Sequence, residues 1–196
     1  MNVLTHFPKL DQIKKNVTQR RLAWSVYKSA HPLIRHRKQS GSEIINFIKQ
    51  NATSGSVVSV DSGPTSMLQF NVDKQYEFKS SEFFWSKVGI PIDYIDKISD
   101  LNCTTKYNNV LACGTTIFKY KNIDQCIDTL LELGQLLDSP GTIIVTLPIT
   151  VMLFHRLKYN YKQIIEIIDN SLSKFGYTIV NSTFDIDIYL IVVKKI

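Results

Sequence analysis

Strand-like and helix-like patterns alternate along most of this chain. Three runs of β-branched and aliphatic residues show little polar alternation and therefore predict strands covered on both faces, at 57–60, 109–113 and 142–148. The segments 123–137 and 161–175 carry apolar residues at helical spacing, and shorter helices are predicted over about 65–74 and 81–88. Gly176 follows the helix at 161–175, where a left-handed residue commonly ends a helix.

The order of the remaining strands gives the fold class. Strand-like segments at 76–79 and 90–95 follow the first buried run, and the chain ends in two more at 177–183 and 188–193. The last two lie too close in sequence for a parallel connection, which needs about a dozen residues or more, so they predict an antiparallel pair. We therefore expect an α/β fold with a mostly parallel sheet, helices on both faces and an antiparallel C-terminal pair.

The N-terminal part is predicted to be helical. Apolar residues recur at helical spacing over about 10–27, and His31-Pro32 ends that pattern; a second short amphipathic helix follows over 44–51. These helices precede the first buried strand. We expect residues 1–52 to form a helical extension or lid on a single compact α/β domain that spans residues 53–196.

The same N-terminal part carries the positive charge of the chain. Residues 1–40 hold nine Lys or Arg and one acid, Asp11, so that this segment is +8 while the rest of the chain is −2. Such a segment attracts anionic partners, and nucleic acid could bind through the basic residues between 9 and 38. The alternative is an ordinary solvated helix face.

Composition narrows the class of protein. With 196 residues, 44% of them apolar, the chain can bury one substantial core. Its three cysteines form no CxxC pair and are odd in number, which favours neither a disulfide framework nor a zinc site, and no other metal site is predicted. The charged N-terminus does not read as a signal peptide, and the longest apolar run, 142–154, is interrupted by polar residues and proline. We expect a cytoplasmic protein with no membrane association, of an oligomeric state that the sequence leaves open.

The strand at 57–60 runs directly into a tight polar turn. The turn contains Asp61, Ser62, Gly63, Pro64 and Thr65. In open parallel sheets ligands bind beyond the carboxyl ends of the strands, so this turn is a candidate binding loop. A simple steric turn, with no ligand, would use the same residues.

This segment resembles the cofactor loop of the class I S-adenosylmethionine-dependent methyltransferases. That loop commonly reads hydrophobic-hydrophobic-Asp-hydrophobic-Gly-x-Gly-x-Gly, and here Gly63 matches its middle glycine, Ser59 its acid and Asp61 its first glycine. The segment 107–148 is similar to the family's fourth strand, following helix and fifth strand, although Asn108 replaces the usual Asp. The resemblance runs from about Ser54 to Ile196. It implies a Rossmann-like, seven-stranded sheet with an inserted antiparallel last strand.

The resemblance also implies a cofactor and a set of site residues. The cofactor is S-adenosylmethionine, and the loop residues that match the family's motif are Ser59, Asp61, Ser62, Gly63, Pro64 and Thr65. The family's second-strand acid, which hydrogen-bonds the ribose hydroxyls, falls by spacing on Glu82, while Asp96 lies where a relative faces the adenine amine. Ala112 and Cys113 end the fourth strand beside the cofactor. His155, Tyr159 and Cys113 are candidates for a role in transfer.

Three functions are compatible with these residues. The first is methyl transfer to a small or nucleotide-like, anionic acceptor, which requires close in-line approach and few obligatory protein groups. The second is an inactive methyltransferase-fold protein that acts as a binding module, which the changed loop and Asn108 favour. The third is another nucleotide-binding α/β protein whose phosphate meets the amides after Asp61, although Pro64 removes one of them.

Overall fold

The structure is a computed structural model of the whole chain. It describes residues 40–63, 70–86, 91–113, 117–118, 122–147, 159–185 and 188–195. The predicted helix at 10–27 and the basic residues between 9 and 38 lie outside this part of the chain.

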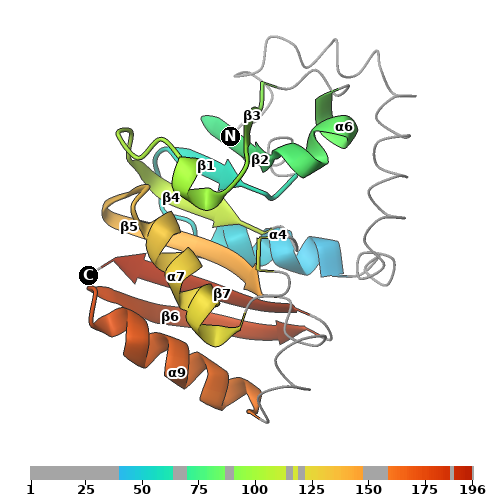
Figure 1. Cartoon of the computed structure of the whole chain (residues 1–196). Coiled ribbons are helices and arrows are strands. Elements are labelled where there is room, and N and C mark those ends of the chain that lie inside the picture. The colour runs from blue at the N-terminus through green and yellow to red at the C-terminus, as the bar shows by residue number, and fades with distance from the viewer. Residues whose placement is uncertain are drawn as a thin grey trace.

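Seven strands form one sheet (Figure 1). In chain order they are β1 Val57–Val60, β2 Lys74–Phe78, β3 Asp93–Ile95, β4 Tyr107–Ala112, β5 Leu137–Leu147, β6 Tyr177–Asp185 and β7 Ile188–Lys195. Their order across the sheet is β3-β2-β1-β4-β5-β7-β6. The strands from β3 to β5 pair in parallel, and β7 is antiparallel to both of its neighbours, β5 and β6. The predicted mostly parallel sheet with an antiparallel C-terminal pair is confirmed.

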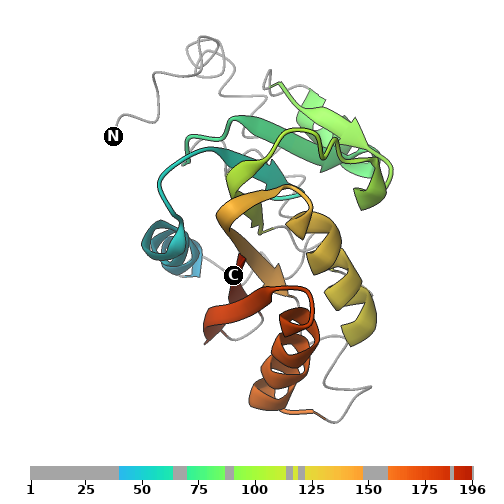
Figure 2. The ribbon, with the colours of Figure 1, turned by 90° about the vertical axis from the view of Figure 1, so that its left-hand side faces the viewer.

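Helices cover both faces of the sheet. In the described ranges they are α4 Ser40–Asn51, α6 Glu82–Trp85, α7 Ile123–Gly134 and α9 Tyr161–Ser173, with short 3-10 turns η2 Lys79–Ser81 and η4 Ile98–Asp100. Figure 2 shows α4 on one side of the sheet and α7 with α9 on the other. No helix in the described ranges is long and apolar enough to cross a membrane.

The two long helices of one face start in the same way. Asn122 precedes α7 and Asn160 precedes α9, and each side chain accepts a hydrogen bond from the backbone N–H of the glutamine three residues later, Gln125 or Gln163. Each glutamine side chain accepts in return from the asparagine N–H. These reciprocal caps satisfy N–H groups that a helix start leaves unpaired. At its other end α9 is followed by Gly176 with φ 79°, as the sequence predicts.

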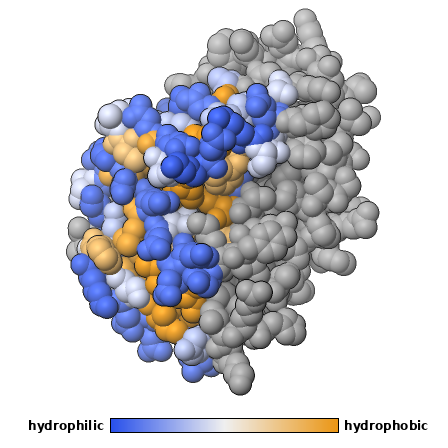
Figure 3. Space-filling model, viewed as in Figure 1, coloured by the Kyte–Doolittle hydropathy of each residue, from blue (hydrophilic) through white to orange (hydrophobic). Residues whose placement is uncertain are grey.

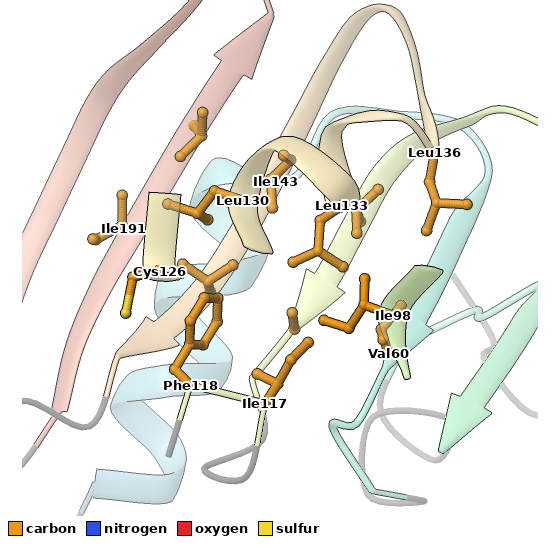
Figure 4. Close-up of a cluster of buried hydrophobic side chains, with 14 of the residues drawn as sticks. Val60, Ile98, Ile117, Phe118, Cys126, Leu130, Leu133, Leu136, Ile143 and Ile191 are labelled. Atoms are coloured by element: carbon orange, nitrogen blue, oxygen red, sulfur yellow. The ribbon is translucent and has the colours of Figure 1, made fainter. Parts of the chain in front are cut away.

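The main core lies between the sheet and the helices α7 and α9 (Figure 4). Leu130 and Leu133 of α7 are at most 1% exposed and pack toward Val60 and Ile143 of the sheet. On the other face Phe47 and Ile48 of α4 pack against Leu111 and Ile144, with Val57 and Cys113 at the margin of this smaller cluster. Successive strand residues point to opposite faces, so the odd-numbered residues of β1 and β2, and Asn109 and Leu111 of β4, lie on the α4 side. Tyr107 at the start of β4 belongs to the main core, because the register shifts between Tyr107 and Asn109.

Some boundaries differ from the sequence prediction. Residues 70–73 of the predicted helix over 65–74 are not helical, and β2 begins directly afterwards at Lys74. Residues 139–141, which lie between the predicted helix and the strand predicted at 142–148, belong to an irregular start of β5, where the register against β4 shifts. The helix that starts at Ile123 ends at Gly134 instead of continuing to residue 137, because Leu137 already pairs with Tyr107 of β4.

The surface over α7 and α9 is mixed. Figure 3 shows hydrophobic patches interrupted by hydrophilic side chains on this face. Among the described residues the large hydrophobic side chains that are exposed are Tyr159, Phe175 and Val180. Phe175 and Val180 lie beyond the end of α9 and on the edge strand β6.

Candidate functional site

The candidate loop leaves β1 in a left-handed turn. Asp61 has φ 51° and Gly63 has φ 70°, and the backbone N–H of Asp61 still donates to the Tyr76 carbonyl of β2 at 2.8 Å. Aspartate tolerates this region of backbone space better than most residues, and glycine occupies it without a steric cost. The chain therefore turns sharply at the carboxyl end of β1 while staying attached to β2.

Ser62 fastens the loop to the next strand on the other side. Its Oγ lies 3.1 Å from the Leu111 carbonyl oxygen, to which it can donate, and it accepts from the Cys113 N–H at 2.8 Å. Because Leu111 and Cys113 flank the end of β4, the serine bridges the carboxyl ends of β1 and β4. Its hydroxyl is used to hold the loop in place.

Gly63 brings its amide to a buried carboxylate. Its N–H donates to Oε1 of Glu77 on β2 at 2.8 Å. Gln75 Nε2 donates to the same oxygen, and the Trp85 side chain from α6 forms a further hydrogen bond to Glu77. A Cβ on Gly63 would lie 3.4 Å from Cζ2 of Trp85, so the indole ring packs closely over this turn. Loop, second strand and α6 thus converge on the Glu77 carboxylate.

Glu77 and Asp61 are both buried acids. Glu77 is 2% exposed and Asp61 is 6% exposed. Burial raises the pKa of Glu77 well above its usual range, the negative charge of Asp61 raises it further, and the hydrogen bonds from Gly63, Gln75 and Trp85 act in the opposite direction. Removal from water and the like charge of Asp61 therefore favour the protonated form of Glu77, and the three hydrogen bonds favour its charged form.

Tyr94 of β3 borders the same place. It is paired in register with Glu77, and burial raises its pKa to about 12, with smaller contributions from the charges of Glu82 and Glu77. Tyr94 is therefore a neutral phenol at any physiological pH. The carboxyl ends of β3, β2, β1 and β4 therefore bring together backbone amides, a phenol and two carboxyl groups.

The structure brings together part of the predicted set. Ser59, Asp61, Ser62 and Gly63 lie together at the end of β1 and in its turn, and Ser59 is completely buried. Ala112 is also completely buried, but its side chain belongs to the main core on the opposite face of the sheet.

Cys113 directly follows β4 and lies beside Ser62, with its Sγ 3.7 Å from the Ile144 carbonyl oxygen. Although the residue as a whole is half-buried, burial of the sulfur raises the pKa of Cys113 to about 12. The thiol therefore stays protonated and is a poor nucleophile at neutral pH.

Other predicted residues lie away from this convergence. Glu82 is exposed at the first position of α6, and Asp96 is exposed after β3, where it pairs with Lys79. Tyr159 is 39% exposed and precedes α9. Pro64, Thr65 and His155 lie outside the described residues. Within the described ranges no three His, Cys, Asp or Glu side chains group as metal ligands.

Asn108 lies near the amino end of β4, whereas the site lies at the carboxyl ends of the strands. Its Oδ1 accepts from the Ser56 N–H at 3.0 Å, and its neighbour Asn109 accepts from the Thr53 N–H at 2.8 Å. Both asparagines are at the amino end of β4, where they hold the segment that enters β1. The replacement of the family's acid by Asn108 therefore affects how this segment is attached and not the chemistry of the loop.

Sequence reasoning missed Glu77 and Trp85. The count from Gly63 to the second-strand acid assumed a helical connection of ordinary length, whereas β2 begins at Lys74 and places Glu77 only 14 residues after Gly63. A signal was present: Gln75 and Glu77 alternate along a strand beside β1, so they share one face of the sheet.

Comparisons with known proteins identify the fold. No protein family model matches the chain, and no curated protein matches its sequence. The 16S rRNA methylase ArmA superposes with a TM-score of 0.59 at 16% identity over 97% of this chain and 100% of its own. The PH0226 protein from Pyrococcus horikoshii OT3 gives 0.58 at 14% identity, over 87% and 98%.

A third solved structure carries a bound cofactor product. The 1,6-didemethyltoxoflavin-N1-methyltransferase of Burkholderia thailandensis, with bound 1,6-didemethyltoxoflavin and S-adenosylhomocysteine, gives a TM-score of 0.56 at 10% identity, over 93% of this chain and 88% of its own. Identities this low establish the architecture alone. The chain has the fold of the class I S-adenosylmethionine-dependent methyltransferases.

Proposed function

We propose that this protein binds S-adenosylmethionine at the carboxyl ends of β1 and β2 and transfers its methyl group to a small or nucleotide-like, anionic acceptor. The observation that carries the proposal is the contact between the Gly63 amide and the Glu77 carboxylate. In this contact a tight backbone turn lies next to a hydrogen-bond acceptor of fixed orientation, at the carboxyl ends of the strands, where ligands of this architecture bind.

Glu77 is proposed as the second-strand acid in place of Glu82. A carboxylate can accept two donors in fixed geometry, as the two hydroxyls of a ribose require. Glu77 projects from the strand next to β1 and touches the loop, whereas Glu82 is exposed on α6. The donors now on Glu77, from Gly63, Gln75 and Trp85, hold its carboxylate in one orientation.

The site residues fit a nucleoside-bearing ligand in other respects. A Cβ on Gly63 would lie 3.4 Å from the buried Trp85 ring, so the glycine lets the backbone of the turn and the flat indole ring lie close together. When bound, the cofactor supplies an electrophilic methyl group on a sulfonium. The chain's own contribution is to orient the ligand and to exclude water from the buried Ser59, Asp61 and Glu77.

The solved relatives support the ligand class. The Burkholderia enzyme and the glycopeptide N-methyltransferase MtfA are both described with S-adenosylhomocysteine bound. The acceptors in the names of the neighbours range from small molecules to 16S rRNA. The +8 charge of residues 1–40 is our reason for preferring an anionic acceptor here.

Calorimetric titration with S-adenosylmethionine tests the proposal. We expect binding by the wild-type protein and a loss of at least about tenfold in affinity for Glu77→Gln, because the amide cannot accept at both positions. Glu82→Gln is the matched control, because it makes the same chemical change at the exposed acid five residues later, and it should bind like the wild type. Tight cofactor binding by Glu77→Gln together with weakened binding by Glu82→Gln would instead support Glu82, the ribose-binding acid that the sequence predicts.

Ligand binding without transfer is a second candidate function. The specific observation is Asp61, which puts a buried carboxyl group where the family's motif has its first glycine. Incubation with methyl-labelled cofactor and a pool of nucleotides, nucleic acids and small anions distinguishes the two. Incorporated label supports the enzyme, and saturable binding with no incorporation into any pool supports the binding module.

A further inference from the structure

The Glu77 carboxylate is closed off from solvent in this structure. Glu77 is 2% exposed, and Trp85 beside it is 3% exposed. The carboxylate already accepts hydrogen bonds from the Gly63 N–H, the Gln75 amide and the Trp85 side chain. A ribose hydroxyl cannot reach this carboxylate while all of these groups stay in place. Binding of the proposed ligand therefore requires that at least one of them moves away.

Two of the three donors belong to fixed parts of the sheet. Gln75 is a residue of β2, and this strand pairs with β1 on one side and β3 on the other. The turn that carries Gly63 is attached to β2 by the Asp61 N–H, which donates to a β2 carbonyl at 2.8 Å. Ser62 attaches the same turn to the end of β4. Displacement of either donor would therefore break hydrogen bonds of the sheet or of this turn.

Trp85 reaches the carboxylate from outside the sheet. It is the last residue of α6, a helix of four residues that follows the end of β2 (Figure 1). Its ring lies close over the turn, since a Cβ on Gly63 would be 3.4 Å from Cζ2 of the indole. The indole nitrogen is a donor only, so its hydrogen bond with Glu77 is one N–H to a carboxylate oxygen. A ligand hydroxyl can replace that donor without reducing the number of donors on the carboxylate.

We propose that the Trp85 indole leaves Glu77 when the cofactor binds, and that a ribose hydroxyl takes its place. The inference rests on the proposed function and adds the movement that this site needs. In the free protein the indole N–H keeps the buried carboxylate paired, which avoids the cost of a buried acceptor that lacks a donor. This hydrogen bond stabilises the closed arrangement, so it lowers the affinity for the cofactor.

Two substitutions distinguish the exchanged donor from a permanent one. Trp85→Phe keeps a ring over the turn but has no N–H to displace, so we expect about tenfold tighter cofactor binding. Gln75→Met removes a donor that stays on Glu77 in both states, so this variant should bind the cofactor no more tightly than the wild type. It is the matched control, because it removes a donor from the same carboxylate and loosens the same buried site.

The test is calorimetric titration of the full chain with S-adenosylmethionine, for the wild type and both variants. A second measurement leaves the site itself unchanged. The other tryptophan of the chain is Trp24, so Trp24→Phe leaves Trp85 as the source of a single indole N–H signal in the proton NMR spectrum. A hydrogen bond to a carboxylate moves an N–H proton downfield, so this signal should move upfield as the cofactor saturates the protein.

The expected result is tighter binding by Trp85→Phe but not by Gln75→Met, together with the upfield shift. If Trp85→Phe does not fold, the direction of the shift decides. Three results would overturn the inference and leave the proposed function standing: no gain in affinity for Trp85→Phe, an equal gain for Gln75→Met, or an indole proton that stays in place or moves downfield. Failure of the wild type to bind the cofactor at millimolar concentration overturns both.

Discussion

Replacement of Gly55 by alanine should be among the most damaging small substitutions at the entrance to β1. Gly55 has φ 131°, and a Cβ there would lie 2.1 Å from Oδ1 of Asn108, far inside contact distance. That oxygen accepts from the N–H of Ser56 at 3.0 Å, with the serine hydroxyl at 3.2 Å. The alanine therefore both strains the backbone and forces Asn108 away from Ser56.

The magnitude follows from these two effects. A side chain in this backbone region costs about 1–2 kcal/mol, and two lost hydrogen bonds cost about 1 kcal/mol each, which together give about 3–4 kcal/mol. Gly176→Ala is the matched control: φ is 79°, but nothing lies within 4 Å of the added Cβ, so we expect about 1 kcal/mol from strain alone.

Urea unfolding followed by circular dichroism measures both free energies of unfolding. The Asn108→Ala background isolates the contact, because Gly55→Ala should cost about 2 kcal/mol less when the asparagine side chain is already absent. Equal costs for the two glycine variants, within about 0.5 kcal/mol, would refute the proposed clash with Asn108.

Three further predictions concern buried polar groups. Thr142→Val and Thr146→Val should each stabilise the protein by about 1 kcal/mol in urea unfolding, because both hydroxyls are buried without a hydrogen-bond partner among the described residues. Destabilisation by either substitution would indicate a partner. Burial raises the folded-state pKa of Glu77 above its unfolded value, so the protonated carboxyl stabilises the fold at low pH and this contribution is lost as the pH rises above about 4. Glu77→Gln should therefore flatten the decline of the unfolding free energy with pH. An unchanged pH profile of unfolding in this variant would contradict the burial of the Glu77 charge. Cys113, whose pKa is about 12, should react with a thiol reagent at pH 8 only after unfolding, and rapid labelling of the folded protein, identified by peptide mass, would contradict this.

The order of the elements could be predicted because it depends on local patterns. Buried strands such as β1 have few polar residues, and the helix over α9 has its apolar stripe and its glycine stop in sequence. The antiparallel end followed from chain length alone, since β6 and β7 are too close for a crossover. These features need no knowledge of distant contacts.

The acid of the site could not be placed in the same way. An acid in an alternating strand, as at Glu77, usually faces solvent, and only the register of β2 against β1 shows that this one lies under the loop. The indole of Trp85 arrives from a helix of four residues whose packing no periodicity reveals. Counting positions from a family pattern chose Glu82 because the connection to β2 is shorter in this chain.

The central claim is that the cofactor binds where Gly63 meets Glu77 and Trp85. The most direct test is a two-dimensional amide NMR spectrum of the full chain, titrated with S-adenosylmethionine. The chain has two tryptophans, so Trp85→Phe assigns the indole signal of Trp85. The account predicts that the Gly63 amide and the Trp85 indole shift in a saturable manner. Saturable shifts elsewhere, with both of these signals unmoved, would contradict it.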